Sequence, residues 1–167
     1  MKNKKDSANT ERQRLREEDF IRLLKYLKET SKLIGKKKAM GILEKLVAEK
    51  RLNWLKENKC RLNLKMKNSI SFIDKVFYKR FYKLAYKDRE VVKKNKYILV
   101  TRWFNYCPVL EACKALDLDT REICRNIYHK PNQIFLSEIN PKLKFKRNYN
   151  KIRPHANYCE EIIEFKR

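Results

Sequence analysis

The sequence predicts an α+β fold, in which N-terminal helices pack on a small antiparallel sheet formed mainly by the C-terminal half. Over the first 90 residues, apolar side chains recur at the spacing of one face of a helix. The later residues contain short runs rich in β-branched and aromatic side chains, which are typical of strands. With two glycines and no Ser/Gly-rich or Pro-rich tract to serve as a linker, we expect residues 1–167 to form a single domain.

Two helices are expected first. Residues 1–9 are polar and we expect them to be disordered. Thr10 to Gln13 has the spacing of a capping box, from which a helix runs to about Ile34. Gly35 is placed to end it, because glycine readily adopts the left-handed conformation that terminates helices. A second helix follows over residues 36–57, and we expect the two to form an antiparallel pair that packs on the rest of the domain.

The segment after the second helix is more ambiguous. Residues 60–66 alternate apolar and polar side chains, which predicts a short half-buried strand. Ser71 to Asp74 has capping-box spacing and begins a further helix, so that residues 10–90 are mainly helical. This helix places three tyrosines four residues apart beside basic side chains: Tyr78, Tyr82 and Tyr86. Such tyrosines either stack on nucleic-acid bases or border a core with their hydroxyls in water.

Residues 91–167 are expected to form a strand-helix-helix-strand-strand unit, which carries both histidines and four of the five cysteines. Residues 96–104 form its best strand, and Val91 and Val92 either begin that strand or belong to a preceding partner. Pro108 ends it and opens a short helix, and Asp119 caps the next. The segment between Pro131 and Pro141 is expected to form one or two helical turns, and two last strands follow, at residues 143–146 and 159–165.

The chain is strongly basic, with a formal net charge of +23. The charge is uneven, since residues 1–100 hold 30 lysines and arginines against 12 acids, and the remainder holds 13 against 8. A basic surface attracts polyanions by counterion release, so a nucleic acid bound through the N-terminal helices is an alternative partner. The same composition, rich in Lys, Asn and Ile and poor in Gly and Ala, also arises from an AT-rich genome without any ligand.

Several functional classes lack their signatures. The N-terminus is polar and no apolar run approaches the roughly 18–20 residues of a membrane span, so we expect a cytoplasmic protein without a membrane partner. The sequence has no phosphate-binding glycine loop, HExxH, GxSxG or paired CxxC motif. We therefore expect no cofactor and no metal, while the oligomeric state stays open.

The remaining chemistry lies in the thiols and imidazoles of the C-terminal third. Cys107 precedes a proline that opens a helix, so its sulfur is placed near the positive helix end. Cys159 lies four residues after His155, although in a strand Cys159 and Glu160 point to opposite faces. Cys113 and Cys124 stand among apolar helical residues and are expected to pack in the core.

A metal site is an alternative use of the same residues. Cys107, Cys124 and Cys159, with one of His129 or His155, would supply four nitrogen and sulfur ligands if the fold brings them together. For His129 we prefer the interpretation of a charge capping a helix C-terminus.

The order of these features resembles the L-2-amino-thiazoline-4-carboxylic acid hydrolase family. The resemblance rests on Cys107-Pro108, Cys124 in a helix, the strand from Leu143 to Arg147 and the final Cys159-Glu160, and it covers roughly residues 97–165. It implies a protein that hydrolyses or binds a small substrate of the cyclic amidine or thiazoline type. The implied reaction is the opening of a thiazoline ring by water, which yields a carbamoyl-cysteine.

Such a hydrolysis needs a nucleophile, a proton donor and an anchor for the substrate carboxylate. The resemblance, combined with residue types, assigns Cys107 or Cys159 as the nucleophile and His155 as the general acid or base. Glu160 would orient the histidine or the water, and Arg102 or Arg153 would hold the carboxylate by a bidentate fork. A non-catalytic domain that senses a ligand or metal is the remaining alternative.

Overall fold

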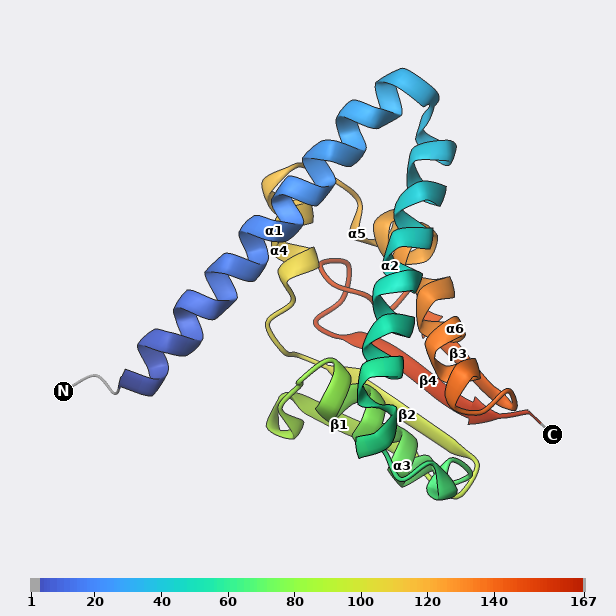
Figure 1. Ribbon diagram of the computed structural model, residues 1–167. Coiled ribbons are helices and arrows are strands. Elements are labelled where there is room, and N and C mark those ends of the chain that lie inside the picture. Colours follow the sequence, from blue (N-terminus) through green and yellow to red (C-terminus); the bar gives the residue numbers. More distant parts are fainter. Residues whose placement is uncertain (1–3, 167) are drawn as a thin grey trace.

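The computed structural model describes residues 4–166, and the side chains of residues 11 and 13–166. It confirms the α+β class. Figure 1 shows a long helical hairpin whose second helix crosses one face of a small antiparallel sheet. Within residues 4–166 no helix is long and apolar enough to span a membrane.

The hairpin consists of α1 (Lys4–Ile34) and α2 (Lys36–Asn58), joined at Gly35. Gly35 has φ 84° and ψ 145°, a conformation that residues with a side chain rarely adopt, so the predicted stop is confirmed. The predicted start is wrong, because α1 begins at Lys4 and the Thr10 to Gln13 segment lies inside it. Residues 1–9 were expected to be disordered. Residues 4–9 belong to α1 instead, and residues 1–3 lie outside the described residues.

The strand predicted over residues 60–66 is wrong. This segment forms two 3₁₀ turns, η1 (Lys59–Arg61) and η2 (Leu64–Met66), with Leu62 buried between them. Strict alternation over so few residues also fits successive tight turns when no neighbouring strand supplies a hydrogen-bond ladder.

The predicted helix that follows is confirmed, with shifted ends. It comprises α3 (Ile70–Asp74), which continues as the π-helical η3 (Lys75–Phe81). Ser69 caps it by accepting a hydrogen bond from the N–H of Phe72, two residues before the predicted start. Tyr86 lies in a separate turn, η4 (Tyr86–Asp88).

Four strands of the described chain form one antiparallel sheet in the order β1-β2-β4-β3. They are β1 (Arg89–Lys94), β2 (Ile98–Trp103), β3 (Leu143–Asn148) and β4 (Cys159–Phe165). The three predicted C-terminal strands are confirmed, and Val91 and Val92 belong to the preceding partner β1. The register places Thr101, Glu161 and Arg147 in one row across the sheet.

The helices between β2 and β3 are α4 (Pro108–Ala115), α5 (Thr120–Ile123), the π-helical η5 (Cys124–Tyr128) and α6 (His129–Ile139). Pro108 opens α4 and the Asp119 carboxylate caps α5, as predicted. Residues 129–139 form a longer helix than the predicted one or two turns. Pro131 lies in the first turn of α6, where a missing N–H costs no helical hydrogen bond.

Two apolar cores meet at α2. The larger core joins α2, α3, η3 and α6 to the inward face of the sheet, where Leu99, Phe145 and Ile163 are buried. The smaller core joins α1, the first half of α2, α4 and η5. Arg51 of α2 is 5% exposed and lies against aromatic rings of both, since its guanidinium is 5.9 Å from the Tyr128 ring and 5.4 Å from the Tyr82 ring.

Candidate functional site

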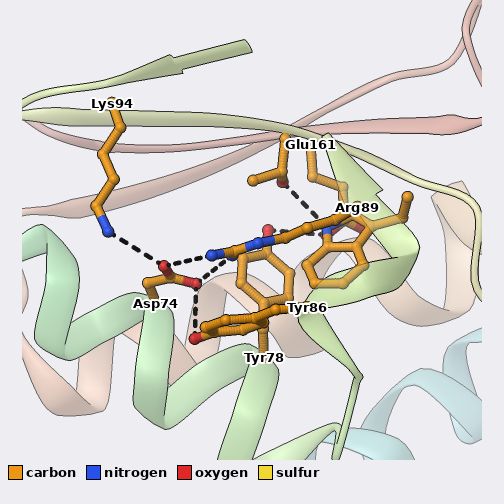
Figure 2. Close-up of polar contacts among 8 residues, drawn as sticks. Asp74, Tyr78, Tyr86, Arg89, Lys94 and Glu161 are labelled. Carbon is orange, nitrogen blue, oxygen red and sulfur yellow. Dashed lines mark hydrogen bonds and ion pairs between the residues drawn. The ribbon is translucent and has the colours of Figure 1, made fainter. Parts of the chain in front are cut away.

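A buried ion pair lies on the inward face of the sheet, under the helices. Arg147 of β3 donates two hydrogen bonds to the Glu161 carboxylate of β4, and both side chains are 10% exposed. The Tyr78 hydroxyl donates to the other carboxylate oxygen at 2.9 Å, and Figure 2 shows this tyrosine rising from its helix toward Glu161. Burial disfavours the charge of Arg147, but the Glu161 carboxylate outweighs it, so the pKa of Arg147 is raised.

His129 lies beside this pair. Its Nδ1 is 2.8 Å from the Tyr149 hydroxyl, and its ring packs on Phe145 at 5.5 Å between centroids. Burial lowers the pKa of His129, and the positive charge of Arg147 lowers it further. The predicted role as a charge at a helix C-terminus is wrong, because His129 begins α6. It provides a neutral imidazole next to the ion pair instead.

Three buried polar atoms near the ion pair have no hydrogen-bond partner among the described residues. They are Arg51 Nη1 on α2, the Tyr128 hydroxyl on η5 and Asn132 Nδ2 on α6. Tyr82 connects them, because its hydroxyl donates to Asn132 Oδ1 at 2.5 Å and its ring lies near Arg51. Ordered water is among the partners that satisfy more than about 90% of buried polar groups, so three donors around one tyrosine without a protein partner mark a place for water or a ligand.

Three thiols influence one another's pKa. Burial raises the pKa of Cys124 to about 12, and the positive charge of Arg147 opposes this rise while Cys107 and Cys159 add to it. Burial also raises the pKa of Cys107, with Cys159 adding to the rise. Burial is thus the main reason why Cys107 and Cys124 stay protonated. Cys113 is fully buried in the smaller core, as expected for a packing residue.

Cys107 has the most polar surroundings of the three. It is the N-cap of α4, and the N–H of Leu110 lowers the pKa of its thiol, as does the nearby Arg153. The sulfur makes no regular capping hydrogen bond, so the contact with the helix end is electrostatic. Arg153 donates from Nη1 to the Asn105 carbonyl at 2.7 Å, and its buried Nε has no partner within the part of the chain that the structure describes. The charge of Arg153 thus acts on the Cys107 thiol.

Glu160 and Arg102 lie on the opposite face of the sheet. Arg102 donates to the Glu160 carboxylate at 3.1 Å, and Asn148 donates to its other oxygen at 2.9 Å. Burial raises the pKa of Glu160, but these hydrogen bonds outweigh it and the pKa is lowered. The prediction that Cys159 and Glu160 point to opposite faces of their strand is thus confirmed. The guanidinium of Arg102 is already bonded to the Glu160 carboxylate.

His155 is exposed and separate from the thiols. Its Nε2 lies 3.3 Å from the Asp119 carboxylate, in the turn that caps α5. Of the six residues predicted for the site, Cys159 and Arg153 both affect the pKa of Cys107. The structure places His155, Glu160 and Arg102 in other interactions.

A second buried ion pair lies nearby and joins the helical layer to the edge strand. Figure 2 shows Arg89 between the Asp74 carboxylate and the Tyr86 ring, with Lys94 approaching from the side. Arg89 donates to Asp74 at 2.6 and 3.1 Å, and its guanidinium carbon is 3.7 Å from the Tyr86 centroid. Every donor and acceptor pair here is internal to the protein, so we regard this cluster as structural.

Neither a metal site nor either of two surface pockets of the described residues includes these buried groups. Among residues 4–166, no three His, Cys, Asp or Glu side chains are arranged to hold a metal ion. Two surface pockets, of about 310 and 460 Å³, lie at the C-terminal end of α2 and contain none of the thiols. The chemically distinctive groups are thus in the interior, away from these pockets.

Sequence reasoning missed Arg147 and Glu161, although the signal was present. The alternation that separates Cys159 from Glu160 puts Cys159 and Glu161 on one face, and Arg147 has the same parity as Leu143 and Phe145. A charge on the apolar side of a strand is a strong indication of a buried partner. Arg51 and Asn132 carried no such signal among many polar helical residues.

Compared with known proteins, the chain matches no family model, and neither a curated protein nor a solved structure is similar to it. The function must therefore be argued from the site itself.

Proposed function

We propose that the chain binds and hydrolyses a small carboxylate-bearing substrate of the cyclic amidine or thiazoline type, in the polar interior between α2, η5, α6 and the sheet. The observation that carries this proposal is the set of unsatisfied buried donors, Arg51 Nη1, the Tyr128 hydroxyl and Asn132 Nδ2. Leaving such a group without any partner costs about 1–3 kcal/mol, so each of these donors favours an acceptor from outside the protein.

A carboxylate is the ligand that these donors fit. It has two oxygens that accept several hydrogen bonds, and a guanidinium supplies both charge and directed N–H groups. Arg51 is held by the surrounding aromatic rings, within 6 Å of Phe81, Tyr82 and Tyr128. The donors are therefore positioned before a ligand arrives, which reduces the entropy lost on binding.

The proposed nucleophile is Cys107, whose thiol affects the pKa of the Tyr128 hydroxyl in this anchor. Because burial raises the pKa of Cys107, its thiol is neutral near pH 7 and must lose a proton to react. An amidine substrate is itself basic, so it accepts this proton and becomes a more electrophilic amidinium. The thiolate then adds to the ring carbon, the ring carbon–sulfur bond breaks, and the ring sulfur leaves as a thiol after taking up a proton. Water hydrolyses the resulting bond to Cys107 and restores the enzyme thiol.

The test is turnover of L-2-amino-thiazoline-4-carboxylate, in which each cycle releases one new thiol. We expect the wild type to release thiol and Cys107→Ala to lose this activity by about 100-fold or more. Cys60→Ala is the matched control, because Cys60 is exposed and outside the site. Mass spectrometry of the quenched reaction should show the substrate attached to Cys107.

Two results would separate the parts of this proposal. Full turnover by Cys107→Ala would remove the thiol mechanism while leaving the site. A wild type that neither turns over nor binds the compound would remove the substrate assignment itself.

A further inference from the structure

The C-terminal end of α2 and the segment after it carry a dense positive charge. Residues 56–87 contain ten lysines and arginines against two acids, Glu57 and Asp74. Asp74 is buried and paired with Arg89, so it does not offset this charge at the surface. All ten basic side chains are exposed: Lys56, Lys59, Arg61, Lys65, Lys67, Lys75, Lys79, Arg80, Lys83 and Lys87. We call these ten residues the α2-end surface.

The α2-end surface differs from the outer face of the sheet and from the first turns of α1 in its lack of neutralising partners. On the outer face of the sheet, Arg102 pairs with Glu160 and Lys146 pairs with Glu164. On α1, Arg14 pairs with Glu11. Within the described residues, none of the ten side chains of the α2-end surface is in an ion pair with an acid. Its charge is therefore available to an external anion.

This surface is also concave. The pocket of about 460 Å³ is lined by Trp54, Asn58, Arg61, Leu62, Arg80 and Lys83. The neighbouring pocket of about 310 Å³ shares Leu62 and adds Lys56, Lys59 and Lys67. Arg80 is held in place because its Nη1 donates to the Arg61 carbonyl at 2.9 Å. Two hollows that share Leu62 and are both lined by cations form one continuous basic depression.

We propose that the α2-end surface binds the phosphate backbone of a single-stranded nucleic acid, with one nucleotide in the larger pocket. Trp54 is half-buried against Phe81 and lines the larger pocket, so an unpaired base in that pocket would contact it, whereas the bases of a duplex are already stacked. An anionic membrane fits less well, because the large apolar side chains exposed within residues 56–87 are Met66 and Tyr86, too few for insertion. This inference does not depend on the buried site, which shares none of these residues.

The test measures binding of a labelled 20-nucleotide oligothymidylate by fluorescence anisotropy over a series of salt concentrations. The test variant is Arg61→Glu/Arg80→Glu/Lys83→Glu. The matched control is Lys37→Glu/Lys38→Glu/Lys45→Glu, which makes the same change of net charge at exposed positions on α2. We expect the test variant to lose about tenfold or more in affinity and the control about threefold or less. Three lost phosphate contacts should reduce the slope of log K against log salt by about 2.

Other outcomes overturn the proposal. Equal losses in both variants would mean that net charge alone attracts the oligonucleotide. Tighter binding of a 20-base-pair duplex would contradict a single-stranded ligand. Binding of vesicles with anionic lipid that is lost in the same variant, without binding of the oligonucleotide, would assign the surface to a membrane. If the triple variant is unfolded by circular dichroism, Lys59→Gln/Lys67→Gln in the smaller pocket provides the same comparison.

Discussion

Arg147 and Glu161 face each other across neighbouring strands with little access to water. Removing one member of such a buried pair leaves an uncompensated charge, which costs about 3–5 kcal/mol. We expect Arg147→Met to lower the free energy of unfolding by about that amount in urea denaturation. The double variant Arg147→Met/Glu161→Leu should recover a large part of the loss, because it leaves no charge unpaired.

The control for this pair is Lys146→Met on the same strand. Lys146 pairs with Glu164 but is 45% exposed, and exposed pairs contribute about 0–1 kcal/mol. Equal losses in Arg147→Met and Lys146→Met would show that the interior pair is no stronger than a surface one.

His129 gives the stability a dependence on pH. Since burial lowers its pKa from the ordinary value of 6.5, the unfolded chain takes up a proton at a higher pH than the folded protein does. The contribution of the neutral, buried His129 to stability is therefore fully present above about pH 6.5 and is lost as the pH falls through that value. In urea denaturation between pH 7.5 and 5.5, we expect the wild type to lose stability and His129→Gln to lose less. Identical pH slopes in the two proteins would contradict this assignment.

A residue of the site could be predicted where its role depends on its immediate neighbours in the sequence. Cys107 was identified because a helix N-terminus follows it directly, and the structure keeps it at that N-cap. His155 was chosen for its closeness to Cys159 in sequence, yet the turn that contains it directs the imidazole to Asp119. Closeness along the chain does not set the direction of a side chain in a loop.

At the scale of elements, the hairpin of α1 and α2 depends on Gly35. Its φ of 84° with ψ of 145° lies in a region used almost only by glycine, and no other atom lies within 4 Å of an added Cβ. Any cost of Gly35→Ala therefore arises from the backbone and should be about 1–3 kcal/mol.

Gly41 provides the opposite case in the same hairpin. It lies in the interior of α2, and no atom lies within 4 Å of an added Cβ there either. We expect Gly41→Ala to raise the free energy of unfolding by about 0.5–1 kcal/mol, because alanine is the better helix former. Thermal and urea denaturation of both variants check the pair of predictions, which fails if the two substitutions change stability in the same direction.

Elements with a long, regular pattern were predicted well, and short ones less well. Strand β2 was predicted from the β-branched and aromatic side chains of residues 96–104, and its burial alternates in the structure. The segment 60–66 has a similar alternation, but the chain supplies no neighbouring strand for it, and a strand depends on its partner. Helix α6 was underestimated because Pro131 interrupts the sequence pattern without interrupting the first turn of the helix.

At the scale of the molecule, the fold class was predictable and the site was only partly so. The class follows from local periodicities, which the sequence displays directly. The site combines Arg51 of α2, Tyr128 of η5, Asn132 of α6 and the Arg147–Glu161 pair of the sheet. Their meeting depends on the strand order β1-β2-β4-β3 and on the packing of α2 against η5 and α6, which no local pattern specifies.

At the scale of the molecule, the net charge of +23 divides into cations that are paired with acids and cations that are not. Part of it is neutralised locally, as in the pairs of α1 and of the outer sheet face. On the α2-end surface, six of the ten unpaired cations line pockets. Residues 56–87 hold about the same share of lysine and arginine as residues 1–100, so this surface is distinguished by its few acids and its hollows rather than by an excess of lysine.

The central claim is that Arg51, Tyr128 and Asn132 bind a substrate carboxylate, and calorimetric titration with a matched pair of ligands tests it most directly. One ligand is L-2-amino-thiazoline-4-carboxylate, titrated into Cys107→Ala to prevent turnover, and the other is 2-amino-thiazoline, which lacks the carboxylate. We expect the carboxylate to bind about tenfold or more tightly, and a further Tyr128→Phe substitution to remove most of that difference. Equal affinity for the two ligands, or a preference that Tyr128→Phe leaves unchanged, would contradict the claim.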